Sequence, residues 1–170
     1  VLAARSQKYA GRLEVVIAVG PSHDRTLEIA QALSQECENV HVVENPSGRT
    51  PDGLNAAIAV AQGDVVVRCD GHALLPNDYV ATAVETLNRT GADNVGGVMD
   101  AQGETLFQRA VAWAMKSKFG VGSAAFHVGG VEGEAETVYL GCFRASALQR
   151  VGGYDTAMTR AQDWEMNHRI

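Results

Sequence analysis

Two side chains that can bind a divalent cation stand two residues apart in the segment Asp70-Gly71-His72. In extended backbone, residues i and i+2 project to the same side, so the carboxylate and the imidazole can converge on one ion. Oxygen and imidazole ligands suit Mn²⁺ or a magnesium-like ion that also binds phosphate oxygens. A solvated turn is the alternative interpretation, and the triplet alone does not decide between a turn and a metal site.

A second group of chemically useful side chains lies near the end of the sequence. Asp163 and Glu165 flank Trp164, and residues two apart on a helix do not share a face, so one carboxylate at most points into a given site. The alternative is that both carboxylates are solvent-exposed charges at the start of a helix and belong to no site. Arg49 follows Gly48 and could bind a phosphate or be an exposed loop arginine. By residue type, Trp164 favours packing over binding.

These residues must be positioned by an alternation of strands and helices. The hydrophobic patterns predict strands at 13–19, 40–43, 64–69, 95–99 and 137–143, and helices at 1–8, 23–36, 50–62, 77–90, 106–116, 146–151 and 163–170. This order predicts an α/β domain with a mostly parallel sheet and helices on both faces. Ligands of such sheets bind at the carboxyl ends of the strands, where Gly20-Pro21-Ser22 and Asp70-Gly71-His72 fall.

Length and composition narrow the function classes. With 170 residues the chain fits one domain, 1–170, and 46% hydrophobic residues supply enough apolar surface for a core. A net charge of −6 has the wrong sign for a protein that holds a polyanion by its whole surface, so we expect no nucleic acid partner. The cysteines lack zinc-site spacing, which favours a reducing compartment, and no apolar run reaches about 18 residues.

The glycine-rich segment 119–133 is predicted to be a loop. A loop of this length is commonly functional, and a surface loop without a role is the alternative. No GxGxxG follows the first predicted strand and no GxxxxGK[ST] occurs, which disfavours a dinucleotide-binding oxidoreductase or a P-loop protein.

The order of these pieces along the chain is similar to family 2 glycosyltransferases, over nearly the whole chain. The segment Arg68-Cys69-Asp70-Gly71-His72-Ala73 resembles most closely the succinoglycan-type glucosyltransferases of bacterial exopolysaccharide synthesis. The other pieces are Gly20-Pro21-Ser22, Gly48-Arg49, Asn55, Gly152-Gly153-Tyr154-Asp155, Gln162-Asp163-Trp164-Glu165 and Arg169.

The resemblance implies a GT-A, Rossmann-like nucleotide-diphospho-sugar transferase fold. It divides the domain into a nucleotide-sugar-binding half, 1–92, and an acceptor and catalytic half, 93–170. The implied enzyme is metal-dependent and inverting. It moves a hexose from a nucleoside diphosphate sugar, with a UDP-sugar expected, to a hydroxyl of a glycan or lipid-linked saccharide. We assign the loop 119–133 to acceptor contact or to a lid over the donor. We expect it to be cytoplasmic, at the inner face of the cytoplasmic membrane, with membrane association through parts outside this chain.

The resemblance also assigns roles to individual residues. Asp70 and His72 match the motif that holds the metal, Mn²⁺ or Mg²⁺, and the diphosphate, and Asp163 matches the catalytic aspartate that accepts the proton of the acceptor hydroxyl. The residues implied to bind substrate are Ser22, Asp24, Arg49, Asn55, Asp70, Trp164 and Arg169.

This sequence departs from the family pattern at two places. Val19 and Gly20 occupy the positions of a usual acidic pair, of which the second acid contacts the base, so base identity stays open. The family's first strand is missing, and the chain is expected to be truncated at both ends. The alternative function is therefore a non-catalytic nucleotide-sugar-binding module or an inactive fragment.

Overall fold

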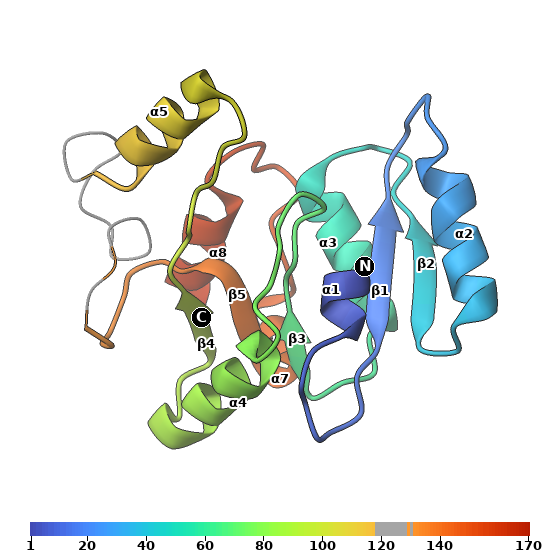
Figure 1. Ribbon diagram of the computed structural model, residues 1–170. Helices are drawn as coiled ribbons and strands as arrows, with labels where there is room; N and C mark the ends of the chain where they lie inside the picture. The colour runs from blue at the N-terminus through green and yellow to red at the C-terminus, as the bar shows by residue number, and fades with distance from the viewer. Residues whose placement is uncertain (118–128, 130) are drawn as a thin grey trace.

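The computed structural model describes residues 1–117, 129 and 131–170 (Figure 1). The helices and strands are, in order, α1 (Leu2–Arg5), β1 (Val15–Val19), α2 (Thr26–Glu36), β2 (Val40–Glu44), α3 (Thr50–Val60), β3 (Val65–Val67), α4 (Tyr79–Thr90), β4 (Asn94–Gly97), α5 (Leu106–Met115), β5 (Tyr139–Arg144), α7 (Ala145–Val151) and α8 (Gln162–Arg169). Most of the predicted loop 119–133 lies outside the described residues. None of the helices in the described ranges is long and apolar enough to cross a membrane.

The first helix is shorter than its predicted range, 1–8. It ends at Arg5, and other partners hold the segment beyond it. The Lys8 N–H bonds to the Asn77 carbonyl at 2.6 Å, and the buried Gln7 side chain donates from Nε2 to the Pro76 carbonyl at 2.7 Å and accepts from the Val80 N–H at 3.0 Å. Both groups of one amide thus tie this segment to the start of α4, which a helical continuation would prevent.

The strands form two separate hydrogen-bonded groups. β1 and β2 pair in parallel, whereas β5 lies between β3 and β4 and runs antiparallel to both. The α/β class with a parallel pair is confirmed, but β5 departs from the parallel arrangement that the alternation of elements predicts. It is also β5 that joins the two sequence halves, since β3 lies before residue 92 and β5 after it.

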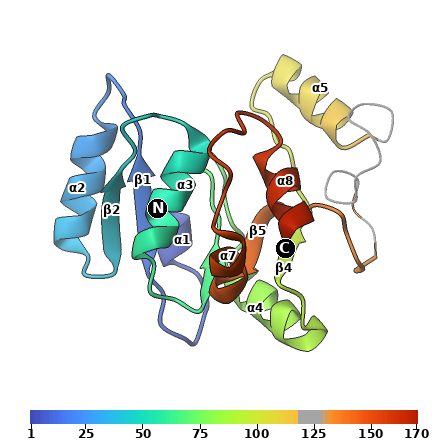
Figure 2. The same cartoon turned by 180° about the vertical axis from the view of Figure 1, so that it is seen from behind.

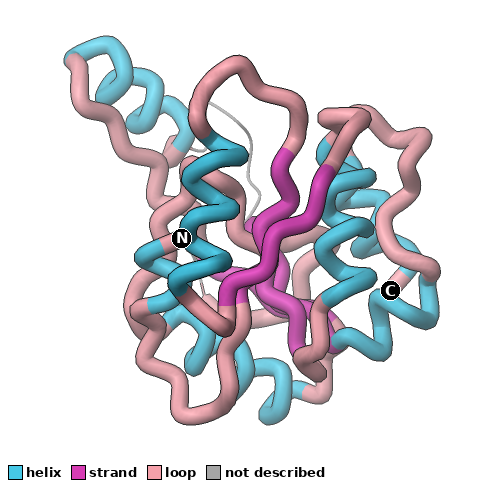
Figure 3. The backbone as a smooth tube through the Cα atoms, turned by 90° about the vertical axis from the view of Figure 1, so that its right-hand side faces the viewer, coloured by secondary structure: helices cyan, strands magenta, loops and turns pink. Residues whose placement is uncertain are grey.

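Helices cover both sides of the strands (Figure 3). Seen from behind, α3, α7 and α8 lie over the strands, with α4 on the other side (Figure 2). Successive residues of β5 build both cores, because side chains alternate along a strand. Phe143 packs with Leu148, Tyr154 and Met166, and Cys142 packs on the α4 side of the sheet with Leu87 among others.

A groove separates β1 from β3. It has a volume of about 500 Å³, and both strands line it along their length, together with apolar residues of α3 and with Val1 and Ala4. Within the described ranges no strand pairs with the edge of β1 or of β3 that faces this groove.

Candidate functional site

Arg68 joins the two carboxylates that the sequence singles out. It directly follows β3, and its backbone N–H bonds to the Gly141 carbonyl at 3.0 Å, which extends the pairing with β5 by one residue. Its Nε donates to Asp70 Oδ1 at 2.9 Å and its Nη1 donates to Asp163 Oδ1. The Arg68 side chain is 10% exposed, so the guanidinium lies beneath the surface of the site. The strand end and α8 are thereby fixed to each other.

Burial and the two neighbouring charges shift the pKa of Asp163. Burial raises the pKa of its carboxyl, the Arg68 cation lowers that pKa, and the nearby Asp70 charge raises it; burial is the largest of these causes and the net direction is upward. Next to them, burial raises the pKa of the Tyr154 hydroxyl to about 12. A carboxylate with a raised pKa and an adjacent cation is a suitable proton acceptor, because it binds a proton more strongly than a free aspartate while the cation favours its ionised form.

A strained residue precedes α8. Ala161 has φ +56° and ψ +23°, in the left-handed region that costs an L-residue about 1–2 kcal/mol. The helix begins directly afterwards, so this conformation sets the direction in which the first turn, with Asp163, enters the site. Strain of this kind concentrates at sites where geometry matters for function.

The segment Asp70-Gly71-His72 is a turn and not extended, as the Ala73 N–H bonds to the Asp70 carbonyl at 2.9 Å. The extended backbone that would project both side chains to one side is therefore not formed here. His72 is exposed in this turn. Asp70 Oδ2 lies 3.4 Å from Arg68 Nη2, a weak contact, and the side chain is 28% exposed, so one oxygen can still bind a cation.

No cluster of three or more His, Cys, Asp or Glu side chains that could hold a metal occurs in the described part of the chain. Asp70 and His72 could supply one or two ligands. That number is compatible with Mn²⁺ or Mg²⁺, which in nucleotide sites takes much of its coordination from substrate phosphates and water. The metal assignment of these residues stays a prediction.

The predicted nucleoside contacts lie at the carboxyl end of β1. Ser22 Oγ donates to Asp24 Oδ1 at 2.7 Å, and the same oxygen accepts the Thr26 N–H at 2.9 Å. These bonds, first those from Thr26 and then that from Ser22, lower the pKa of Asp24 to about 2. Both predicted residues are exposed, and Asp24 satisfies one backbone N–H at the start of α2, that of Thr26.

Three further predicted residues converge on the turn between α7 and α8. Arg49 donates to Asp52 Oδ2 at 2.8 Å and to the Thr156 carbonyl at 2.9 Å. Asn55 exchanges two bonds with the Tyr154 backbone, 2.7 Å to its carbonyl and 2.8 Å from its N–H.

Arg169 donates to the carbonyls of Val151 and Gly153, at 2.6 and 2.8 Å, and binds the Glu165 carboxylate. Arg49, Asn55 and Arg169 thus have protein partners, which brings the turn against α3 and α8. Trp164 is half exposed, and its ring stacks on His168 with centroids 5.6 Å apart.

Sequence reasoning missed Arg68 and Tyr154. The signal for Arg68 was an arginine two residues before an acid at the end of a buried strand, a position from which its side chain can reach that acid. Nothing local indicates that Arg68 also reaches Asp163, because the two residues are 95 positions apart.

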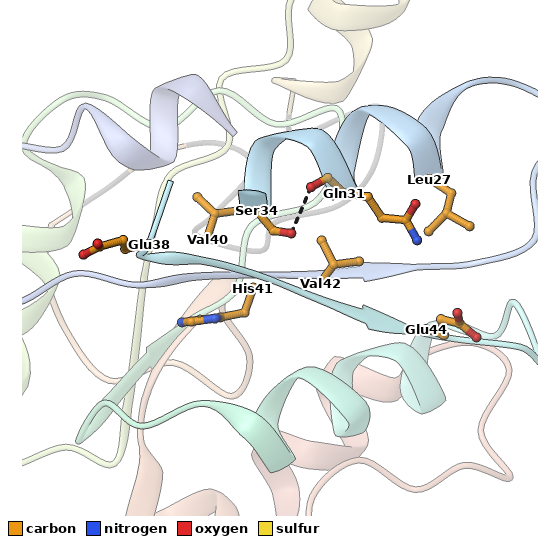
Figure 4. A pocket seen from close by; sticks show the side chains of 8 residues that line it. All are labelled: Leu27, Gln31, Ser34, Glu38, Val40, His41, Val42 and Glu44. Atoms are coloured by element: carbon orange, nitrogen blue, oxygen red, sulfur yellow. Dashed lines mark hydrogen bonds between the residues drawn. The ribbon is translucent and has the colours of Figure 1, made fainter. Parts of the chain in front are cut away.

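The site opens into the groove between β1 and β3, which Arg68, Asp70 and Tyr154 also line. A second hollow, of about 420 Å³, lies at the outer edge of β2 beside α2 (Figure 4). There Val40 and Val42 point towards α2 and His41 points away from it. None of the predicted site residues lines this second hollow, so the chemistry is placed at the first.

Comparison with known proteins identifies relatives along nearly the whole chain. Residues 1–150 match the family model described as Glycosyl transferase family 2, so Asp163 lies beyond the matched range. Succinoglycan biosynthesis protein ExoA of Rhizobium meliloti (strain 1021) is 37% identical over 158 residues, 92% of this chain and 48% of that protein. Dolichyl N-acetyl-alpha-D-glucosaminyl phosphate 3-beta-D-2,3-diacetamido-2,3-dideoxy-beta-D-glucuronosyltransferase of Methanococcus voltae is 24% identical over 163 residues, 91% of this chain and 50% of that protein.

Solved structures show the same fold. S. aureus TarS 1-349 in complex with UDP superposes with a TM-score of 0.69 at 17% identity and covers 98% of this chain and 48% of that one. The mannosyltransferase PcManGT from Pyrobaculum calidifontis in complex with GDP-Man and Mn²⁺ gives 0.63 at 21% identity, over 95% and 44%. The chain thus spans about half the length of the relatives that it matches.

Proposed function

This chain belongs to glycosyl transferase family 2, and on that basis we propose that it transfers a hexose from a nucleoside diphosphate sugar to a hydroxyl of a glycan or lipid-linked saccharide. The observation that carries the proposal is the Arg68 guanidinium, which holds Asp70 at the strand end and Asp163 on α8 in one site. The two carboxylates share Arg68 but come from different elements and differ in exposure, 28% for Asp70 and 41% for Asp163, so they can perform separate tasks, one towards the donor and one towards the acceptor.

Asp163 is the base in this proposal. It accepts the proton of the acceptor hydroxyl as that oxygen bonds to the anomeric carbon and the bond to the diphosphate breaks, in a single displacement with inversion. Arg68 keeps the carboxylate ionised and oriented before the acceptor arrives, and Ala161 sets the direction of the helix that carries it.

Asp70 and His72 would hold a divalent cation, Mn²⁺ or Mg²⁺. When bound, the ion neutralises charge on the diphosphate leaving group. The support from this chain is the loosely held Oδ2 of Asp70, together with the donor types that such cations prefer. Among the structural relatives, PcManGT is in complex with Mn²⁺.

The donor is expected to lie along the carboxyl ends of β1 and β3, with a UDP-sugar as the first candidate. Ser22 and Asp24 are placed at the nucleoside and Arg49 near the phosphates, with Asn55, Trp164 and Arg169 completing the substrate-binding set. TarS is in complex with UDP and PcManGT with GDP-Man, so a uridine and a guanosine diphosphate sugar are both tested as donors. We place the reaction at the inner face of the cytoplasmic membrane, where lipid-linked acceptors occur.

The replacement Asp163→Asn tests the assignment of the base. It removes the proton acceptor but keeps the side-chain size, so transfer should fall about 100- to 10,000-fold while calorimetric binding of UDP-glucose or GDP-mannose with Mn²⁺ changes little. Asp64→Asn is the matched control, since Asp64 is exposed and its side chain has no described partner. Wild-type turnover in Asp163→Asn would contradict the base assignment.

A companion variant separates the enzyme from a binding module without turnover. Asp70→Ala should weaken the binding of both Mn²⁺ and donor, whereas Asp163→Asn should spare both. Donor binding that requires Mn²⁺ and Asp70, without transfer to any hydroxyl acceptor, would favour the non-catalytic module. A folded chain that binds neither nucleotide sugar would contradict both candidate functions.

A further inference from the structure

The Tyr154 hydroxyl is a buried polar group that the fold itself does not use. The residue is 4% exposed, and in the part of the chain that the structure describes no group forms a hydrogen bond with its Oη. Burying a hydroxyl without a partner is unfavourable, and phenylalanine would fill nearly the same space without this cost. The ring serves the core, so the hydroxyl needs a separate explanation.

The position of this hydroxyl is fixed from two sides. The Tyr154 ring packs edge-on against Phe143, with centroids 6.4 Å apart and planes at 78°. Asn55 binds the backbone of the same residue at both its N–H and its carbonyl, at 2.8 and 2.7 Å. The side chain therefore does not turn out to solvent, and a partner must come to the hydroxyl.

The charged groups near the hydroxyl belong to the candidate site. Tyr154 shares a core cluster with Met166, which follows Asp163 by three residues on α8, and residues at this spacing are neighbours on one helix face. After burial, the Asp163 charge is the next cause that raises the pKa of the Tyr154 hydroxyl to about 12, while the Arg68 cation lowers that pKa. The hydroxyl therefore keeps its proton at neutral pH and can donate it in a hydrogen bond to a carboxylate.

Arg68 binds the Asp163 carboxylate and Asp70 at the same time. We propose that Tyr154 is a positioning residue for Asp163: its hydroxyl is the second hydrogen-bond donor for that carboxylate and bonds to it when Arg68 releases it. This inference rests on the proposed transfer, because the diphosphate of the donor is the anion that competes for Arg68. The exchange moves no proton, so Asp163 stays ionised and able to accept the proton of the acceptor hydroxyl.

A double-mutant cycle on stability tests the hydroxyl without any sugar donor, so its failure is distinct from failure of the proposed transfer. In the parent chain, Tyr154→Phe should leave the melting temperature unchanged or raise it, because an unbonded hydroxyl is lost. In an Arg68→Met background Asp163 has lost its other donor, so the same change should lower the melting temperature by about 2–4 °C. Equal effects in the two backgrounds overturn the proposal. A lower melting temperature of Tyr154→Phe in the parent also overturns it, since the hydroxyl would then already be bonded.

Tyr79→Phe is the matched control for the cycle. Burial likewise raises the pKa of the Tyr79 hydroxyl to about 12, but this hydroxyl has a partner, the Leu140 carbonyl at 2.8 Å. Its removal should lower the melting temperature alike in both backgrounds, because that bond does not depend on Arg68. Circular dichroism verifies the folding of each variant.

Steady-state kinetics separate positioning of Asp163 from a purely structural role. Tyr154→Phe should lower kcat about tenfold, the value of one hydrogen bond, and change KM for the donor less than about twofold. Tyr79→Phe should leave kcat unchanged. Wild-type kcat in Tyr154→Phe overturns the proposal, also where Arg68→Met does not fold. A folded parent without transfer would instead contradict the proposed function.

Discussion

At the scale of single residues, the guanidinium of Arg68 determines how the two carboxylates of the site act. It neutralises Asp163 and one oxygen of Asp70 at the same time, from a nearly buried position. A planar guanidinium can do this because its nitrogens point in fixed, divergent directions, whereas the ammonium of lysine is a single point. The geometry of the site and its charge balance therefore depend on the same side chain.

Arg68→Met should therefore lower both stability and activity. It leaves Asp70 and Asp163 facing each other without a cation, and since both carboxylates are partly exposed we expect a loss of about 1–3 kcal/mol in the free energy of unfolding, measured by urea denaturation. Arg68→Lys should recover most of the stability but only part of kcat, with KM for the donor changed less than kcat. The exposed Arg12→Met is the control. Full activity in Arg68→Met would contradict the coupling.

Asp24 provides a pH-dependent prediction. Its pKa is about 2 in the folded chain against an ordinary 3.8, so its contribution to stability is complete above about pH 4 and is lost as pH falls towards 2. NMR titration of the side-chain carboxyl should give a midpoint near 2. Ser22→Ala should move the midpoint upward without restoring 3.8, because the bonds from Thr26 remain. Ser34→Ala, which removes a hydroxyl elsewhere on α2, should leave it unchanged; a midpoint near 3.8 in the parent would contradict the bonding described.

At the scale of elements, the turn after α7 is held by a close contact with α3. Gly152 and Gly153 have nearly equal φ angles, +76° and +77°, but a Cβ on Gly153 would lie 2.6 Å from Asn55 Oδ1, whereas nothing lies within 4 Å of one on Gly152. Gly152→Ala should cost about 1–2 kcal/mol, from backbone strain alone. Gly153→Ala should cost more, because it also displaces the Asn55 amide from Tyr154. Thermal unfolding compares the two variants, and equal losses would show that the contact with Asn55 has no energetic effect.

The elements themselves are largely predictable from local pattern. The ranges of α2, α3, α4, α5 and α7 follow from apolar spacing and from breakers such as Gly63 and Gly91, which act within a few residues. The antiparallel direction of β5 and the end of α1 at Arg5 follow from partners far along the chain, such as Pro76 for Gln7. In the same way, the sequence indicates Asp70 and Asp163 as candidate site residues, but it does not indicate that Arg68 binds both carboxylates.

At the scale of the whole molecule, the two hydrogen-bonded strand groups share no strand pairing in the described ranges. They are joined by side-chain packing and by the Glu14 carboxylate, which accepts the Gln62 and Gly63 N–H groups at 2.6 and 3.0 Å. Helix α3 contacts β1 and β2, and its Leu54 and Ile58 also pack on the core around Phe143. Residues of α3 and Asp70 both line the groove between β1 and β3. The position of the proposed donor site relative to the carboxyl end of β1 thus depends in part on α3.

Amide hydrogen exchange tests the open groove. The Val15 N–H bonds to Asn39 on the β2 side, and backbone N–H groups alternate in direction along a strand, so Ile17 also points to β2 whereas Val16 and Ala18 point into the groove. Val16 and Ala18 should therefore exchange at least about tenfold faster than Ile17.

The same alternation applies on the other wall of the groove. Arg68 donates to Gly141, so Val66 faces β5, and Val65 and Val67 face the groove. These two should exchange faster than Val66 by a similar factor. Equal protection of neighbouring residues on both strands would mean that the N–H groups facing the groove are hydrogen-bonded to other backbone groups. The two strand groups would then unfold as one sheet. Alternating protection on both walls would show that no backbone pairing crosses the groove between β1 and β3.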